Sequence, residues 1–246
     1  ELVLQAPIRQ LNLKKIGDRY FNNAVFNQWG ASGLAAVWAE ENTRNSIFEA
    51  FRRKETYATS GTRIKLRFFA GYDLDGSLLD SDDAIKQAYK LGVPMGQDLE
   101  SSDGAKPSFL VWALRDKNSA PLQRVQIIKG WVDRVTGKPH EEVIDVLCSD
   151  GLMPDPETNR CPDNGALVDI SDCSISSDVG ANELKTVWTD KSFDPSVKAF
   201  YYVRVLENPT CRWSTWDAIK TGNEPREDLK KTIQERAWSS PIWYSY

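Results

Sequence analysis

The feature that most constrains the fold is a series of short strand-like segments from residue 63 onward, separated by turn-forming residues. In residues 63–69 basic and apolar side chains alternate with a period of two, which is typical of a strand with one buried face. Similar segments follow at residues 108–114, 122–129, 143–148, 184–188 and 199–206. Many short strands with turns between them favour an antiparallel β-sandwich. One short helix is expected near residues 82–91, and the aromatic segment 237–244 is expected to dock onto a sheet.

A different pattern precedes this region. Residues 33–39 form a continuous apolar run of the buried-strand type. A helix is expected to follow, with Asn42 or Thr43 as its N-cap, because amide and hydroxyl side chains satisfy the free N–H groups of a first helical turn. Its apolar side chains are Ile47, Phe48 and Phe51. The spacing of these residues predicts an ordinary amphipathic helix.

The strand, the helix and a further strand at residues 56–59 predict a β–α–β-like passage. Residues 1–30 show no sustained hydrophobic period and are expected to form an irregular connection. We therefore place a domain boundary near Gly61, which separates residues 1–60 from a β-domain at residues 61–246.

The four cysteines point to an oxidising compartment. Cys148 and Cys161 bracket residues 149–160, which are rich in turn formers and poor in core residues. Such a loop cannot hold itself by burial, and a Cys148–Cys161 disulfide would stabilise it by roughly 3 kcal/mol. Cys173 and Cys211 would then pair across a longer loop. The alternative is four free, buried thiols. Disulfides predict a periplasmic or extracellular protein.

Charge and histidine content limit the chemistry. The chain has 31 Lys and Arg against 35 Asp and Glu, a mildly acidic balance that argues against a general nucleic-acid binder. No apolar run reaches the length needed to cross a bilayer. His140 is the single histidine and lies in a charged, turn-rich context, so we interpret it as a solvated loop residue. One histidine cannot supply the several imidazoles that zinc and iron hydrolase sites commonly use.

Several segments together carry a resemblance to a known family: residues 33–61, residues 148–151 (Cys-Ser-Asp-Gly), residues 160–166 (Arg-Cys-Pro-Asp-Asn-Gly-Ala), residues 201–216 and residues 237–244 (Ala-Trp-Ser-Ser-Pro-Ile-Trp-Tyr). They resemble the C-terminal part of an uncharacterised bacterial family of longer proteins. That family is similar to the PHP-type (polymerase and histidinol phosphatase) metal-dependent hydrolases.

The resemblance implies a fold and a missing part. It implies a mainly β protein with some α structure: an immunoglobulin-like antiparallel β-sandwich, preceded by the last β/α unit of a PHP-like (β/α) barrel at residues 1–60. The metal-binding His and Asp motifs of such a barrel have no matching position in this chain, so we assign no metal ligand. Divalent metal ions are expected in the missing barrel portion. The expected partner is that N-terminal segment or a companion chain.

The candidate substrate-binding residues follow the expected strand at residues 33–39. They are Glu40, Glu41, Asn42 and Arg44. Active sites of (β/α) barrels lie at the carboxyl ends of the strands, so these side chains could contact a metal-bound phosphate-like or sulfate-like substrate, with Arg44 as an anion clamp. The alternative is that they only cap the helix and complement its dipole.

Two further motifs have structural interpretations. Residues 150–164 offer several carboxylate and amide oxygens, as calcium loops do, but they lack the alternating EF-hand spacing, so we interpret them as a disulfide-pinned surface loop. Trp213 and Trp216 are expected to be core or interface residues. Nine tryptophans could provide a sugar-binding platform, although most lie in strand patterns and are expected in the core.

Two functional hypotheses remain. The first is the C-terminal portion of an exported, PHP-like metal-dependent hydrolase, possibly a phosphoesterase. Its metal site and metal-bound water would belong to the missing part, and this chain alone would be inactive. The alternative is a non-catalytic β-sandwich that binds a glycan or a protein partner. Because the chain begins at Glu1 without a methionine, we expect that a leading segment has been removed. No catalytic residue is assigned.

Overall fold

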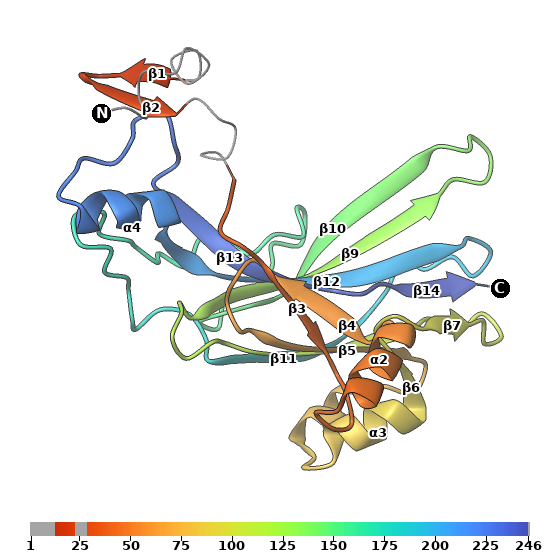
Figure 1. Ribbon diagram of the computed structural model, residues 1–246. Coiled ribbons are helices and arrows are strands. Elements are labelled where there is room, and N and C mark those ends of the chain that lie inside the picture. Colours follow the sequence, from red (N-terminus) through yellow and green to blue (C-terminus); the bar gives the residue numbers. More distant parts are fainter. Residues whose placement is uncertain (1–12, 23–28, 246) are drawn as a thin grey trace.

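The computed structural model describes residues 13–22 and 29–245, and this part of the chain is mainly β-structure (Figure 1). The larger of two main sheets contains eight strands: β3 (Leu34–Val37), β4 (Thr56–Thr59), β7 (Asp98–Glu100), β9 (Leu122–Val132), β10 (Pro139–Cys148), β12 (Ala199–Cys211), β13 (Thr232–Ser239) and β14 (Ile242–Ser245). Its main path runs β10-β9-β12-β13-β4-β3, while β14 pairs with β12 and β7. The expected docking of the aromatic C-terminal segment is confirmed, since β13 and β14 both pair with β12.

The smaller sheet has four strands: β5 (Lys65–Gly71), β6 (Gly92–Pro94), β8 (Ser108–Leu114) and β11 (Glu183–Thr189). They pair antiparallel in the order β11-β8-β5-β6. Alternate residues of both sheets point into one buried core, where the ring centroids of Phe109 and Tyr201 lie 4.4 Å apart. The mainly β prediction is therefore confirmed, with two open sheets that face each other.

Among the described residues, three α-helices lie outside the sheets: α2 (Arg44–Arg52), α3 (Ala84–Leu91) and α4 (Trp213–Lys220). A 3-10 helix, η2 (Gly76–Asp80), precedes α3. The expected helix near residues 82–91 is confirmed as α3, whose Ala88 packs in a second apolar cluster with Phe69 and Leu110 of the smaller sheet. Helix α4 lies where we expected core or interface tryptophans, yet Trp213 and Trp216 are each 40% exposed on it. No helix in residues 13–22 and 29–245 is long and apolar enough to span a membrane.

The strand–helix–strand passage differs from its sequence-based prediction. A β–α–β unit joins parallel strands, but β3 and β4 pair antiparallel, with Val37 opposite Thr56. The chain therefore returns to the sheet at the end where it left, because α2 folds beyond the strand ends and does not run back along the sheet. Strand β4 also pairs with β13, so the larger sheet contains strands from both sides of Gly61. The domain boundary at Gly61 stays a prediction.

An additional hairpin was not expected from the sequence. Strands β1 (Leu13–Ile16) and β2 (Arg19–Asn22) pair antiparallel around a two-residue turn, in which Gly17 has a φ of 58°. The prediction of an irregular connection was wrong for residues 13–22, since a four-residue strand is too short to show a clear period. The rest of that prediction falls on residues outside the described part or between elements. Figure 1 places the hairpin beside α4, and Arg19 Nη1 donates to Asn223 Oδ1 at 2.6 Å.

Candidate functional site

The four candidate substrate-binding residues lie at the start of α2. Thr43 is the N-cap and accepts a hydrogen bond from the Ser46 N–H at 3.3 Å. The Glu41 carboxylate accepts from the Thr43 hydroxyl at 3.3 Å, so Glu41 supports the cap. Asn42 and Arg44 are exposed beside it. Glu40 alone lines a cavity. The structure brings the four residues into one short segment, and their role in substrate binding stays a prediction.

The cavity beside Glu40 has a volume of about 660 Å³ and contains a buried ion-pair network. At its base Glu55 is 3% exposed and binds two guanidinium groups, those of Arg53 at 3.5 Å and Arg67 at 3.4 Å. The Tyr89 hydroxyl donates to the same carboxylate. Arg67 also lies 3.4 Å from the ring centroid of Trp38, which is a close cation–π contact.

The electrostatics of this cavity are nearly balanced. Burial raises the pKa of Tyr89 to about 12, and its hydrogen bond to the Glu55 carboxylate adds to the rise. The hydroxyl therefore keeps its proton at neutral pH and acts as a donor. Both arginines are paired with Glu55, whose negative charge partly balances theirs. Together these contacts hold the carboxyl end of β3 against α3 and β5. The exposed Glu40 lines the same cavity.

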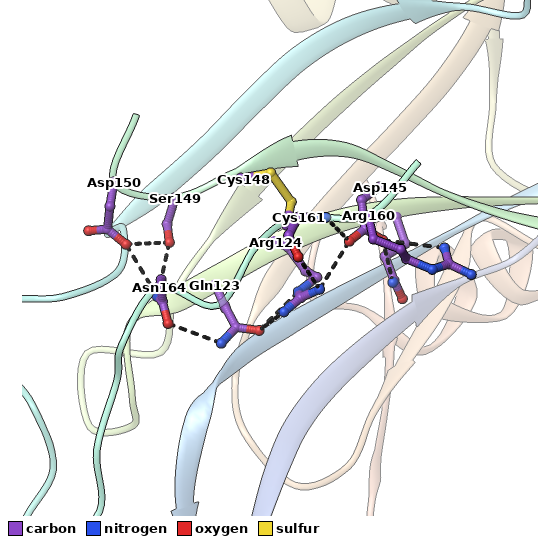
Figure 2. Close-up of a disulfide and its surroundings, with 10 residues drawn as sticks. Gln123, Arg124, Asp145, Cys148, Ser149, Asp150, Arg160, Cys161 and Asn164 are labelled. Carbon is purple, nitrogen blue, oxygen red and sulfur yellow. Dashed lines mark hydrogen bonds and ion pairs between the residues drawn. A yellow bond between two sulfur atoms is a disulfide. The ribbon is translucent and has the colours of Figure 1, made fainter. Parts of the chain in front are cut away.

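Both predicted disulfides are confirmed. Cys148 pairs with Cys161 and Cys173 with Cys211, and no described cysteine is free. The first disulfide lies at the end of β10 (Figure 2) and closes the loop over residues 149–160. The second ties the segment after Asp169 to the end of β12.

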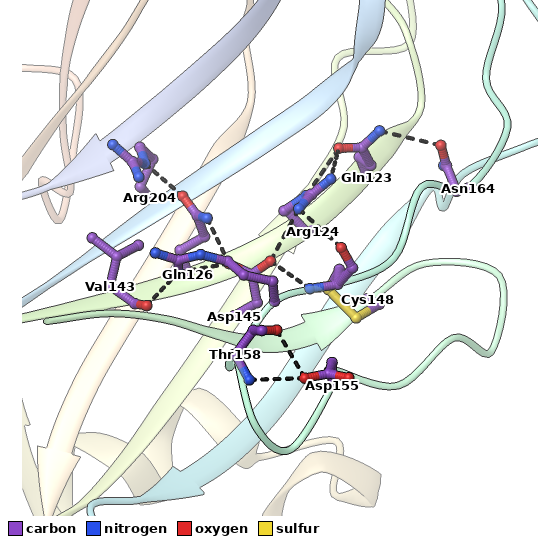
Figure 3. A network of polar contacts seen from close by, with 12 residues as sticks. Gln123, Arg124, Gln126, Val143, Asp145, Cys148, Asp155, Thr158, Asn164 and Arg204 are labelled. Atoms are coloured by element: carbon purple, nitrogen blue, oxygen red, sulfur yellow. Dashed lines mark hydrogen bonds and ion pairs between the residues drawn. A yellow bond between two sulfur atoms is a disulfide. The ribbon is translucent and has the colours of Figure 1, made fainter.

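Asp145 is the centre of a polar network around the first disulfide (Figures 2 and 3). Its buried carboxylate accepts hydrogen bonds from Arg124 at 3.0 Å, from the Gln126 amide at 2.5 Å and from the Cys161 backbone N–H at 2.7 Å. Arg160 approaches the same carboxylate at 3.7 Å. The charge of Asp145 is therefore used to anchor the disulfide loop on β9 and β10.

Among the acidic residues of this loop, Asp155 and Asp163 serve local turns, and Asp150 binds a distant segment. Asp155 accepts from the backbone N–H groups of Glu157 and Thr158, and Asp150 accepts from the N–H of Gly180. Asp163 accepts from the N–H of Gly165. Their carboxylates do not converge. Within residues 13–22 and 29–245, no group of three or more His, Cys, Asp or Glu side chains is arranged to hold a metal ion.

A second buried charge network lies on the inner face of the larger sheet. Lys129 Nζ donates to Asp190 Oδ2 at 2.6 Å, and the Tyr201 hydroxyl donates to the same oxygen at 2.8 Å. All three side chains are almost completely buried. Burial alone would raise the pKa of Asp190, but the hydrogen bonds from Lys129 and Tyr201 outweigh it and hold that pKa below its usual range. The network forms part of the wall of a cavity of about 500 Å³.

With this geometry established, comparison with known proteins gives a family. A family model described as a protein of unknown function, DUF3604, matches residues 6–246. The chain belongs to the DUF3604 family. Searches of curated proteins and of solved structures each found no match for this DUF3604 chain.

Sequence reasoning missed the Lys129 cavity in this DUF3604 chain, although one signal was present. The residues of β9 alternate so that Val125, Ile127, Lys129 and Trp131 share one face. A lysine among inward-facing apolar residues must find a buried counter-ion, because an unpaired buried ammonium group is very costly. Its partner, Asp190, comes from a loop 61 positions later, and no local pattern connects the two.

Proposed function

We propose that this chain is the C-terminal, non-catalytic portion of an exported, PHP-like metal-dependent hydrolase whose substrates are phosphoesters. In this proposal the sandwich is immunoglobulin-like, and β3 with α2 forms the last unit of a barrel. The remaining barrel segment, on the same chain or on a companion chain, would pack against them. The resemblance carried by residues 33–61 and by the cysteine and tryptophan segments supports the proposal.

The observation that carries the proposal is an edge of the larger sheet with exposed apolar side chains beside it. Strand β3 is the last strand on the main path of the larger sheet and pairs only with β4 among the described residues. Beside it, Phe48 and Phe51 of α2 are 58% and 51% exposed, and Leu34 of β3 is 43% exposed. Full burial of such a side chain contributes about 1.5–3 kcal/mol, so a further polypeptide segment would gain considerably by covering this edge.

The proposal assigns the metal chemistry to the missing part. When bound there, divalent metal ions would supply an activated water for hydrolysis. Because the described residues offer no converging ligand group, none of them is assigned to the metal. Glu40, Glu41, Asn42 and Arg44 would contact the substrate from the edge, and the exposed guanidinium of Arg44 would bind a phosphate oxygen pair.

The two disulfides support the exported part of the proposal. Disulfides persist in the periplasm and outside the cell, whereas cytosolic thiols are kept reduced. The structure contains both bridges, and one of them closes a loop with little core of its own. We therefore place the protein in the periplasm or outside the cell.

The proposal is tested on the protein isolated from its natural source. We expect intact mass and co-purification to reveal further polypeptide, metal analysis to show bound divalent ions, and phosphoester hydrolysis to be sensitive to chelators. The purified 246-residue chain should show no such turnover. Chelator-sensitive hydrolysis by this chain alone, or a native protein that contains no further polypeptide, would contradict the proposal.

The second candidate function is a non-catalytic module that binds a glycan or a protein partner. The cavity beside Lys129 supports it, because that cavity combines a buried charge network with the half-buried indole of Trp131.

A further inference from the structure

The cavity beside Lys129 has an opposite charge directly across the sheet. Lys129 of β9 and Glu142 of β10 are register partners on neighbouring antiparallel strands, and both point to the inner face. Such a cross-strand pair would ordinarily form an ion pair. Here Lys129 binds Asp190 and the Ser192 carbonyl at 2.6 and 3.4 Å instead. The Glu142 side chain forms no ion pair and no hydrogen bond among the described residues.

This arrangement leaves one donor and one acceptor facing the same space. An ammonium group carries three N–H donors, and the two contacts of Lys129 account for two of them. The half-buried Glu142 carboxylate can only accept. A hydroxyl group is the complementary ligand, because it accepts from Lys129 and donates to Glu142 at the same time. A carboxylate or phosphate would satisfy Lys129 but would be repelled by Glu142.

Trp131 supplies an aromatic wall to the same cavity. His140 stacks on one side of its indole, with ring centroids 5.3 Å apart and planes inclined by 14°. The register partner on the other side is Ala199, a small residue that also lines the cavity, and Lys129 Nζ lies 5.4 Å from the centroid of the indole. In Figure 1 this end of β9 and β10 extends beyond the smaller sheet. An aromatic face beside hydroxyl-binding groups suits a sugar ring, which has apolar C–H faces and polar edges.

We propose that the inner-face cavity formed by Trp131, Lys129 and Glu142 binds a neutral saccharide, with its ring against Trp131 and a hydroxyl between Lys129 and Glu142. This inference rests on the second candidate function and is independent of the hydrolase proposal. The charges disfavour an anionic ligand, because Lys129 is already neutralised by Asp190 and the other charged residues of the lining, Asp133, Arg134, Glu142 and Asp194, are negative in sum.

The test is binding of purified protein to a saccharide panel. The probes are the hexasaccharides of β-1,4-glucose, β-1,4-xylose and β-1,4-mannose, with polygalacturonate as the anionic probe, followed by calorimetry and tryptophan fluorescence. We expect at least one neutral probe to bind and the anionic probe not to bind. Glu142→Gln, which keeps the side-chain shape, and Trp131→Ala should each weaken binding about tenfold or more.

Matched controls lie on the opposite face of the same sheet. Glu141 is adjacent in sequence and points outward, and Trp243 of β14 is 47% exposed on that outer face. Glu141→Gln and Trp243→Ala should leave affinity within twofold, and thermal unfolding of every variant establishes that it is folded. If a saccharide binds and its affinity does not change in Glu142→Gln and Trp131→Ala, the proposed site is wrong, but the proposal of a binding module is still supported. Preference for the anionic probe also overturns the site. Absence of binding by every neutral probe overturns both.

Discussion

The two ends of the larger sheet are stabilised in different ways. At the β10 end, the loop over residues 149–160 has few apolar side chains and is held by Cys148–Cys161 and by the Asp145 network. At the β3 end, the ion pairs of the buried Glu55 hold the end of α2 beside the cavity, while Phe48 and Phe51 are exposed. We call these regions the disulfide end and the β3–α2 edge.

The difference shows which region is self-sufficient. A loop that cannot bury apolar surface can be stabilised by a covalent bond and satisfied hydrogen bonds, and the disulfide end has both. The β3–α2 edge has exposed apolar side chains and a strand that pairs only with β4 among the described residues, so a covering segment would stabilise it. Substitutions inside the disulfide end should therefore lower the stability of the chain. Substitutions at the β3–α2 edge should change its stability little until the covering partner is present.

The largest expected effect is loss of the disulfides. Their loops span 38 and 13 positions, so replacing Cys173 and Cys211 by Ala should lower the free energy of unfolding by about 4 kcal/mol. The same change at Cys148 and Cys161 should cost about 3 kcal/mol. Urea unfolding of both double variants measures this difference. Unchanged stability of the Cys148 and Cys161 variant would show that the disulfide end does not depend on its covalent bond.

A comparable loss is expected on removal of the buried charge at the disulfide end. Asp145→Ala removes the carboxylate that accepts from Arg124 and from the Cys161 N–H. It should lower the free energy of unfolding by about 3 kcal/mol. This is the lower part of the range for breaking a buried ion pair, because the Arg124 side chain is still 19% exposed. Asp155→Ala is the matched control, because that carboxylate serves only an exposed turn. Equal losses for the two variants would show that burial of Asp145 is unimportant.

Glu207 lies on β12, a strand between the two ends of the larger sheet, and it makes stability depend on pH. Burial raises the pKa of Glu207 to about 7, and the negative charges of Glu235 and Asp116 add to the rise. The folded state therefore binds more protons than the unfolded state between about pH 4.5 and 7, so stability falls as the pH rises through that window, by roughly 3 kcal/mol at most.

The variant Glu207→Gln should flatten this dependence and should be relatively more stable than the parent at pH 8 than at pH 5. Glu157→Gln, on the exposed loop, is the control and should keep the parent's slope. Denaturant unfolding from pH 4 to 8 measures both. If the stability of Glu207→Gln changes with pH as strongly as that of the parent, another group causes the pH dependence.

The smallest effect is expected at the β3–α2 edge. Joint replacement of Phe48 and Phe51 by Ala should change the stability of this chain by no more than about 0.5 kcal/mol, because both side chains are exposed. Phe109→Ala in the core, which is fully buried, should cost about 3–5 kcal/mol. A large loss from the exposed pair would show that these rings are already packed within the chain.

The sequence predicted those elements whose signals are local. Period-two alternation located β5, turn-forming residues at the segment ends located β8 and α3, and the turn-rich loop between Cys148 and Cys161 led to the correct pairing. The direction of β4 relative to β3 could not be predicted, because it depends on where α2 packs. The roles of Asp145 and Lys129 were also missed, since each depends on a partner from a distant segment.

Hydrogen exchange on the purified monomeric chain tests the central claim most directly, namely that the β3–α2 edge is incomplete without a further polypeptide segment. Exchange is slow where opening requires global unfolding and fast where a segment opens alone. We expect amides of β3 and α2 to exchange much faster than those of β12, which pairs with strands on both sides. Addition of the covering segment should then slow exchange in β3 and α2. Protection of β3 and α2 equal to that of β12 in the chain alone would contradict the account.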